Sequence, residues 1–512
     1  MGIFRASREQ AAQGRLSVMT TATADLECRR RAATKHLDDA HRSQLGQFFT
    51  PEPVARFMAS LFEQPPRGKH LAILDPGAGI GSLSAALLAH LRGHGDVTAY
   101  EIEPSFQDHL KATLSVFPGE HVIQQRDFIA QAVMAVASGK ARGGLFDAVI
   151  ANPPYKKIQT GSTHRALMRK LSLETSNLYT CFVACAIALS KPGAQVVAII
   201  PRSWMNGPYF LPFRHWLFAH AALTHIHVFE SRDRAFKEDK VLQENVIVRL
   251  VVAAPQGEVQ VSSSHDETFR DLMRRTVPFS EVVTPGDEQM FVHIPTPGAA
   301  STNGLPGHTL RELGLDVCTG PVVDFRLRGH LRSEPCVGSV PLLYSTHFNG
   351  GFGWPRQTRK PNAIMVNEHT RRWLMPNGSY VVLRRFTSKE ERRRVVAYLL
   401  EEHALPGPLL GFENHLNVIH QDLHGLDPAV ARGMAAYLNS QAVDDYFRTF
   451  SGHTQVNATD LRRLRYPSTE ELRKMGERVE EESTRGPTNP RRSWDAEGAA
   501  KRTVRAVPAR DL

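Results

Sequence analysis

From about residue 44 to residue 252, short apolar runs alternate with segments of helical periodicity. Short apolar runs predict buried strands, and apolar positions three and four apart predict helices. The expected strands are Leu71–Leu74, Val97–Tyr100, His121–Gln124, Phe146–Ile150, Gln195–Ile200, Leu223–Val228 and Asn245–Val252. The clearest helices are Leu83–Leu91, Ser105–Val116 and Tyr179–Leu189. Strands that alternate with helices predict an α/β domain with a doubly wound, parallel, seven-stranded sheet, whose ligands bind at the carboxyl ends of the strands.

The pattern weakens on both sides of this domain, which spans residues 44–254. Residues 1–43 are polar and basic and predict a loosely helical lead-in. After Ala254 the content of Pro, Gly, Ser and Thr rises, which predicts a linker over 255–304 and then a mixed α+β domain over 305–467. Residues 468–512 are charged and poor in apolar side chains, so a disordered tail or a single frayed helix is expected.

Composition excludes several classes of protein. The longest apolar stretches are far too short to span a membrane, and the N-terminus lacks the apolar core of a secretory signal, so a cytoplasmic protein is expected. The five cysteines are odd in number and scattered, which indicates reduced thiols rather than a disulfide framework. No group of residues has the spacing of a zinc site, and no metal is expected.

Positive charge concentrates in the second half of the chain. Residues 356–394 contain eleven Lys and Arg against three Glu, so that segment has a net charge of +8. The whole chain has a net charge of +10. Aromatic residues are interleaved with the basic ones, among them Trp373 and Phe386. A solvated surface is the simpler explanation, but a basic stretch that carries aromatic rings favours a nucleic-acid groove. The candidate DNA-binding residues are Arg356, Arg359, Lys360, Arg371, Arg372, Arg384 and Arg385.

The expected strand Phe146–Ile150 runs through Ala151 into the tetrapeptide Asn152-Pro153-Pro154-Tyr155. Each proline has a fixed φ and no N–H, so the chain is expected to leave the sheet here as a stiff turn. The turn offers an amide and backbone carbonyls as acceptors beside an aromatic ring. This suits a planar amino group, whose hydrogens meet the acceptors while the ring stacks on its heterocycle. A Pro-Pro turn with a packed tyrosine is the structural alternative, and the tetrapeptide alone does not decide between them.

A glycine-rich segment, Asp75-Pro-Gly-Ala-Gly-Ile-Gly81, follows the first expected strand and precedes a helix. Glycines allow a tight turn and a close approach to a ligand, and the helix N-terminus offers free N–H groups. Glu101 ends the next strand, where a carboxylate would bind both ribose hydroxyls. The spacing G-x-G-x-G differs from the dinucleotide fingerprint G-x-G-x-x-G.

Asp127 and Phe128 follow the third expected strand. The carboxylate can accept a hydrogen bond from an exocyclic adenine amine, and the ring can flank the adenine. A helix N-cap followed by a core phenylalanine is a real competitor.

With these blocks in order, the sequence resembles the amino-group DNA methyltransferases, specifically the N6-adenine enzymes with the asparagine form of the tetrapeptide. Gln47–Pro51 resembles the family's first block, which lies along the methionine part of S-adenosylmethionine. Phe236 resembles the aromatic residue that packs on the other face of the flipped base. The resemblance implies that S-adenosylmethionine is bound by Phe49, Thr50, Pro51, Asp75, Gly77, Gly79, Gly81, Glu101, Ile102, Asp127, Phe128 and Asn152. It implies catalysis by Asn152, Pro153, Pro154 and Tyr155, with Tyr155 and Phe236 stacking on the target base.

The order of the blocks resembles the gamma class, to which the TaqI-type enzymes belong. Only about seventy residues separate Gly81 from Asn152, which leaves no room for a recognition domain between them. Val317–Gly320 and Ser451–Leu461 look like signatures of the recognition domain of that class, which follows the catalytic domain. Within the family, Leu45-Gly-Gln47 and Lys156-Lys-Ile158 resemble the PstI and BsuBI modification enzymes, which implies CTGCAG as the recognition site.

The resemblance implies a seven-stranded S-adenosylmethionine-dependent methyltransferase fold with a C-terminal target-recognition domain. It implies site-specific methylation of adenine N6 in double-stranded DNA by a monomer in the bacterial cytoplasm, and a cognate restriction endonuclease encoded separately. Three alternatives stay open: a catalytically silent DNA-binding protein with this fold, a solitary regulatory adenine methyltransferase, and methylation of RNA or of a protein glutamine. No nuclease carboxylate cluster is evident outside these blocks, so a fused endonuclease is not expected.

Overall fold

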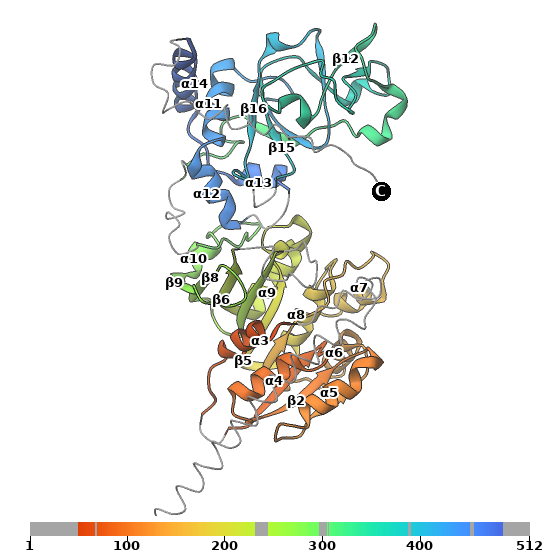
Figure 1. Ribbon diagram of the computed structural model, residues 1–512, viewed down its shortest axis with the longest axis vertical. Coiled ribbons are helices and arrows are strands. Elements are labelled where there is room, and N and C mark those ends of the chain that lie inside the picture. Colours follow the sequence, from red (N-terminus) through yellow and green to blue (C-terminus); the bar gives the residue numbers. More distant parts are fainter. Residues whose placement is uncertain are drawn as a thin grey trace, which may run out of the picture. The chain divides into compact units, whose positions relative to one another are not determined.

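The computed structural model describes residues 50–66, 69–230, 244–295, 305, 307–387, 391–450 and 455–484. The chain divides into two compact units, residues 1–299 and 300–512 (Figure 1). The lead-in predicted over 1–43 lies outside the described residues. Among the helices that the structure describes, none is long and apolar enough to cross a membrane.

The first unit contains a nine-stranded sheet with the strand order β3-β2-β1-β4-β5-β7-β6-β8-β9. Its strands are β1 (Leu71–Pro76), β2 (Gly95–Tyr100), β3 (Val122–Gln124), β4 (Phe146–Ala151), β5 (Ser190–Pro201), β6 (Ala221–Phe229), β7 (Asn245–Val252), β8 (Glu258–Ser264) and β9 (Met273–Pro278). All seven expected strands are present. The order reverses between β1 and β4, so the carboxyl ends of these strands form the edge at which such folds bind their ligands.

Helices cover both faces of this sheet (Figure 1). One buried cluster joins the sheet to α3 (Glu52–Ser60), α4 (Ser82–His90) and α5 (Gln107–Leu114). The other joins it to α6 (Phe128–Ala137), α7 (Thr163–Arg169), α8 (Leu178–Ala188), α9 (Leu211–His220) and α10 (Phe279–Val282). Successive residues of β4 alternate between them, since Val149 and Ala151 belong to the second cluster and Ile150 to the first. The near-continuous apolar sequence of β4 follows from this two-sided burial.

The sheet differs from the expected one in two ways. It is mixed rather than parallel, because β7 pairs antiparallel with both β5 and β6. It is also larger, because β8 and β9 lie within the segment predicted as a linker. The residues Ser262–Ser264 of β8 are buried although they are polar. Ser262 Oγ lies 2.8 Å from His225 Nε2 and 2.9 Å from His227 Nδ1, so hydrogen bonds to β6 replace the apolar contacts that a sequence pattern detects.

The second unit contains two sheets and four α-helices among its described residues, in agreement with the predicted α+β class. One sheet has the order β10-β18-β15-β16 and the other β11-β13-β12-β17-β14. The strands are β10 (Asp316–Thr319), β11 (Leu331–Arg332), β12 (Ser339–Leu343), β13 (Ala363–Met365), β14 (Leu374–Pro376), β15 (Tyr380–Arg384), β16 (Ala397–Leu400), β17 (Leu409–Phe412) and β18 (Leu416–His420). The helices are α11 (Pro428–Leu438), α12 (Gln441–Phe450), α13 (Ala458–Arg463) and α14 (Thr469–Thr484).

Residues 469–484 form helix α14, which agrees with the helical alternative for this segment, but the helix is packed rather than frayed. Leu472 is fully buried, and two glycines bring α14 against α11. A Cβ added to Gly433 of α11 would lie 1.8 Å from the carbonyl oxygen of Leu472, and one added to Gly476 of α14 would lie 1.9 Å from that of Ala429. The backbones therefore pack closely with few apolar side chains, and an apolar-poor sequence hides this contact.

We expect Gly433→Ala to lower the free energy of unfolding of the second unit. Overpacking costs about 1–3 kcal/mol and outweighs the roughly 1 kcal/mol that alanine adds to helix propensity. Urea unfolding of the purified chain measures the difference. Gly329→Ala is the matched control, because an added Cβ there meets no atom within 4 Å. Equal stability of the two variants would contradict the close α11–α14 contact.

Candidate active site

A cleft of about 250 Å³ lies at the carboxyl ends of β1, β2, β3 and β4. Eight residues that the sequence predicted line it: Gly77, Gly79, Glu101, Ile102, Asp127, Phe128, Asn152 and Pro154. They come from four separate segments of the chain, and the sheet topology brings them together. Thr50, Pro51, Asp75, Gly81, Pro153 and Tyr155 were also predicted but do not line the cleft. Phe49 and Phe236 lie outside the described residues.

Asn152 is held between two hydroxyl groups. Its Nδ2 donates to Thr50 Oγ1 at 3.0 Å, and its Oδ1 accepts from the Tyr155 hydroxyl at 2.9 Å. The Tyr155 hydroxyl also lies 3.2 Å from the carbonyl oxygen of Ile199 in β5. The Tyr155 ring meets the ring of Tyr179 edge to face, with centroids 6.4 Å apart. The amide orientation is therefore fixed, with its oxygen directed toward the tyrosine.

Glu101 is a buried carboxylate at the edge of the cleft. Oε2 accepts from the backbone N–H of Gly79 and Oε1 from that of Glu103, each at 2.8 Å. Burial raises the pKa of Glu101, and these two hydrogen bonds counter the shift. The bond to Gly79 also ties the carboxylate to the glycine loop. Each oxygen retains acceptor capacity for a ligand hydroxyl group.

The glycine loop adopts the backbone conformation that its composition indicates. Gly77 and Gly79 have φ values of +78° and +56°, and Gly81 caps α4 with φ +88°. Asp75 at the start of the loop is fully buried and accepts from Ser84 Oγ at 2.6 Å. Burial raises the pKa of Asp75 to about 7. In this structure Asp75 supports the start of α4, and its contact with a cofactor stays a prediction.

Asp127 has the N-cap role considered as its alternative. Its Oδ1 accepts from the backbone N–H of Ala130, and its Oδ2 lies 2.6 Å from His164 Nε2. Phe128 is buried and contacts Tyr100 and Phe182, each at a centroid distance of 5.2 Å. Both residues also line the cleft, so their structural and ligand-binding roles are compatible. The adenine contacts stay a prediction.

Sequence reasoning missed several lining residues, namely Tyr100, Phe106, Arg126, Ile129, Lys156, His164, Leu178 and Phe182. Phe106 and Phe182 lie near the N-termini of their helices, at the carboxyl edge of the sheet. Aromatic residues at this position were a usable signal. His164 lies in α7, beyond the turn Asn152–Tyr155, and no pattern in the sequence indicated its contact with Asp127.

The His164–Asp127 pair predicts a pH dependence of stability. The hydrogen bond to Asp127 raises the pKa of His164 above its ordinary 6.5, and the bond to His164 lowers the pKa of Asp127 below its ordinary 3.8. The histidine contribution is complete below pH 6.5 and is lost as the pH rises through the raised value. The carboxylate contribution is complete above pH 3.8 and is lost as the pH falls through the lowered value.

We therefore expect His164→Gln to lower the free energy of unfolding more at about pH 5.5 than at about pH 9. The pair is partly exposed, so the effect should stay below about 1 kcal/mol. Urea unfolding of both proteins at the two pH values measures it. A destabilisation that is independent of pH would rule out an ionic contribution from this pair.

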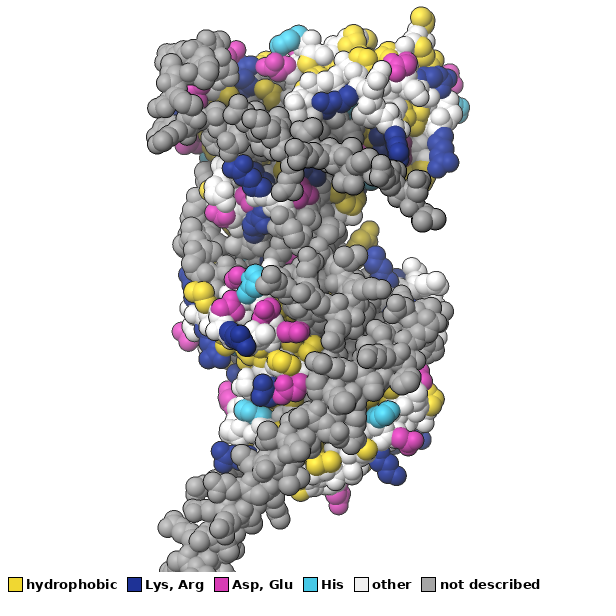
Figure 2. All heavy atoms as spheres, in the orientation of Figure 1, with side chains coloured by type: hydrophobic (Ala, Val, Ile, Leu, Met, Phe, Trp, Pro, Cys, Tyr) yellow, Lys and Arg dark blue, Asp and Glu magenta, His cyan; other side chains and the backbone are white. Residues whose placement is uncertain are grey.

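The candidate DNA-binding residues differ in their surroundings. Four make contacts within the second unit: Arg356 donates to the carbonyls of Thr346 and Asn349, Lys360 pairs with Asp324, Arg384 pairs with Glu391, and Arg385 donates to the carbonyl of Asn414. The other three, Arg359, Arg371 and Arg372, are exposed. Figure 2 shows Lys and Arg side chains scattered among acidic and uncharged ones on the described surface in view. Contact of these residues with DNA stays a prediction.

The cleft is suited to a nucleoside. The Glu101 carboxylate, at the end of one strand, can accept hydrogen bonds from hydroxyl groups. Apolar walls are formed by four rings, those of Tyr100, Phe106, Phe128 and Phe182. The fixed amide of Asn152 lies at the end of β4. Among the described residues, no group of three or more His, Cys, Asp or Glu side chains is placed to hold a metal ion.

Comparison with known proteins extends this picture. The family model described as Eco57I restriction-modification methylase matches residues 93–236. The type II methyltransferase M.BsuBI of Bacillus subtilis is 45% identical over 458 residues, which cover 86% of this chain and 91% of that protein. The type II methyltransferase M.PstI of Providencia stuartii is 41% identical over 476 residues, covering 88% and 92%. A cryo-EM structure of a DrdV–DNA complex is similar with a TM-score of 0.49 and 11% identity, covering 89% of this chain and 59% of that one.

Proposed function

Because the chain belongs to the type II methyltransferases of restriction–modification systems, we propose that it transfers a methyl group from S-adenosylmethionine to N6 of an adenine in double-stranded DNA. In this proposal the chain acts on DNA as a monomer in the bacterial cytoplasm. The methyl group protects the site from a restriction endonuclease encoded separately. One observation supports the adenine assignment above the others. Asn152 is held by hydrogen bonds to Thr50 and Tyr155, and it lines the same cleft as Glu101.

The residues of the cleft fit S-adenosylmethionine. Glu101 is buried, yet its carboxylate faces a cleft of about 250 Å³ and can accept both ribose hydroxyls. The aromatic side chains of the cleft can pack against the adenine of the cofactor, and Gly77 and Gly79 leave room for a close approach of the backbone. When bound, S-adenosylmethionine supplies an electrophilic methyl group on a sulfonium. Asn152 and Pro154 border the cleft, so that methyl group and the target amine would meet at this end of β4.

The protein residues act on the target amine through position and hydrogen bonding. The lone pair of adenine N6 is delocalised into the ring, which makes the nitrogen a poor nucleophile. Asn152 Oδ1 and the Pro153 carbonyl accept the two N6 hydrogens and favour a pyramidal nitrogen whose lone pair points at the methyl group. The base must leave the double helix to reach this turn, and stacking on Tyr155, with Phe236 opposite, offsets the lost base stacking.

Sequencing the methylated bases in DNA from cells that express the chain tests the proposal directly. We expect N6-methyladenine at one recurring sequence, CTGCAG by the resemblance to the PstI and BsuBI enzymes, and none in cells with an empty vector. Radiolabelled methyl transfer to purified DNA is the matching measurement in vitro. Methylation of cytosine alone, or of no base, would overturn the assignment.

A further inference from the structure

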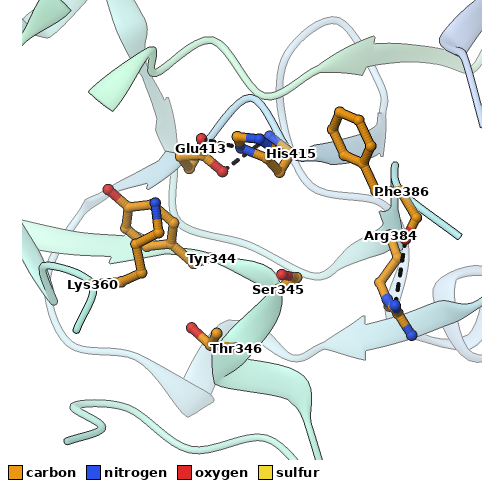
Figure 3. A pocket seen from close by; sticks show the side chains of 8 residues that line it. All are labelled: Tyr344, Ser345, Thr346, Lys360, Arg384, Phe386, Glu413 and His415. Atoms are coloured by element: carbon orange, nitrogen blue, oxygen red, sulfur yellow. Dashed lines mark hydrogen bonds and ion pairs between the residues drawn. The ribbon is translucent and has the colours of Figure 1, made fainter. Parts of the chain in front are cut away.

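A second pocket lies entirely within the second unit and shares no lining residue with the proposed cofactor cleft (Figure 3). Its volume is about 260 Å³, and its lining residues are Tyr344, Ser345, Thr346, Lys360, Arg384, Phe386, Glu413 and His415. They come from the end of β12, the segment before β13, the end of β15 and the turn between β17 and β18. In Figure 3, Tyr344 and Lys360 lie on one side, Arg384 and Phe386 on the other, and Glu413 and His415 between them.

Two hydroxyl groups of this pocket lack hydrogen-bond partners among the described residues. They are the Tyr344 hydroxyl and Thr346 Oγ1, and both atoms are buried. Tyr344 is 2% exposed, and burial raises the pKa of its phenol, with the nearby carboxylates Asp324 and Glu413 acting in the same direction. The phenol therefore keeps its proton and can both donate and accept. A buried hydroxyl without a partner destabilises a fold, and these two belong to the lining of one pocket, so both are open to hydrogen bonds from a ligand there.

The charges of the pocket argue against a phosphate ligand. Lys360 Nζ pairs with Asp324 at 3.0 Å, and Arg384 pairs with Glu391 at 2.9 Å. The buried carboxylate of Glu413 lies 2.5 Å from His415 Nδ1. Each cation thus has a carboxylate beside it, and a further carboxylate belongs to the lining. A phosphate site needs an excess of positive charge, whereas an uncharged group with donors and acceptors does not.

Two rings at the rim offer a surface for a planar group. The Phe386 ring is 40% exposed, although phenylalanine is usually buried, and its centroid lies 5.0 Å from that of the His415 ring. Glu413 contacts His415 at Nδ1, which leaves Nε2 as the ring nitrogen available to a ligand. The pocket therefore combines an apolar face with polar atoms in its floor and at its edge.

From these features we infer that the pocket reads the groove edge of a nucleobase in the recognition sequence. Phe386 makes an apolar contact beside that edge, and the donors and acceptors of the base meet the Tyr344 and Thr346 hydroxyls and His415 Nε2. A nucleobase is planar and uncharged and carries both donors and acceptors, which matches the unpartnered hydroxyls and the pairing of Lys360 and Arg384 with carboxylates. The inference rests on the proposed function and assigns to these residues the reading of one base pair.

The test uses the full-length chain and a series of duplexes in which each base pair of the methylated sequence is replaced in turn. A replaced base pair weakens binding by roughly 5- to 150-fold in specific complexes. We expect Tyr344→Phe and Phe386→Ala to reduce this discrimination at one shared base pair to within about threefold and to leave it unchanged at the others. Tyr344→Phe keeps the buried ring and removes one oxygen. Phe325→Ala is the control, because Phe325 is exposed in the same unit but does not line the pocket.

Two outcomes would overturn the inference. Equal weakening for every duplex, together with a weaker salt dependence, would make the pocket a backbone contact. Unchanged discrimination at all positions would show that it reads no base. The N6-methyladenine product of the wild-type chain is measured in the same experiment. If the wild type forms none, the proposed function fails. If the wild type forms it and the variants discriminate as before, only the pocket assignment fails.

Discussion

Asn152→Ala should lower the rate of methyl transfer by roughly 100- to 1,000-fold, the loss that follows when one preorganised hydrogen-bonding group is removed from a transition state. The alanine removes Oδ1, the acceptor that favours a pyramidal amine. Cofactor affinity should change only a few-fold, because the glycine loop and Glu101 stay in place. Single-turnover transfer of a labelled methyl group measures the rate, and calorimetric titration with S-adenosylmethionine measures the affinity.

Two further variants distinguish the acceptor oxygen of Asn152 from the hydrogen bond with Thr50 that orients the amide. Asn152→Asp keeps an acceptor oxygen at the same position, so it should lose less activity than the alanine variant. Thr50→Val removes the hydroxyl that accepts from Asn152 Nδ2 at 3.0 Å and frees the amide to rotate, so an intermediate loss is expected. Wild-type rates in Asn152→Ala would refute the proposed mechanism.

Glu101→Gln should weaken the binding of S-adenosylmethionine by roughly 10- to 100-fold, since hydrogen bonds to charged groups contribute about 1.5–3 kcal/mol each. Both carboxylate oxygens already accept backbone N–H groups, from Gly79 and Glu103. The amide nitrogen of glutamine must therefore face an N–H, and it can no longer accept from the ribose. At saturating cofactor the transfer rate should stay within a few-fold of wild type.

Glu103→Gln is the matched control for this variant. Glu103 lies on the same segment, and its side chain accepts from Ser105 rather than lining the cleft. Titration of the three proteins with S-adenosylmethionine gives the comparison. Equal weakening by both substitutions would indicate a general electrostatic effect and would remove Glu101 from its proposed contact with the ribose.

The hydrophobic pattern was sufficient to predict the strands of the first unit wherever the buried side chains are apolar. Strands such as β4, with Ile150 and its neighbours buried on both faces, leave a continuous signal in the sequence. Because parallel strands bring their carboxyl ends to one edge, the positions of Gly79, Glu101 and Asn152 also predicted their meeting at one cleft.

The pattern failed where polar or glycine contacts replace apolar ones. Strand β8 is held in part by Ser262 between two histidines, and α14 docks through Gly433 and Gly476. The pocket of the second unit is formed by segments that are distant in sequence, so no local sequence motif predicts it. Lys360 and Arg384 were predicted as DNA-binding residues from the basic stretch, and the sequence did not indicate that both pair with carboxylates.

The Tyr155 hydroxyl, which donates to Asn152 Oδ1 at 2.9 Å, sets a condition on any base that enters this site under the proposed function. A base with an amino group can donate to the same oxygen, so hydrogen bonding is conserved when it docks. At the position of adenine N6, thymine would place its O4 and guanine, whose amino group is at C2, its O6 against Oδ1, which leaves two acceptors facing each other at a cost of about 1–3 kcal/mol. Under the proposed function, this hydrogen bond therefore favours a base with an amine at the position of adenine N6 and disfavours the others before any covalent bond forms.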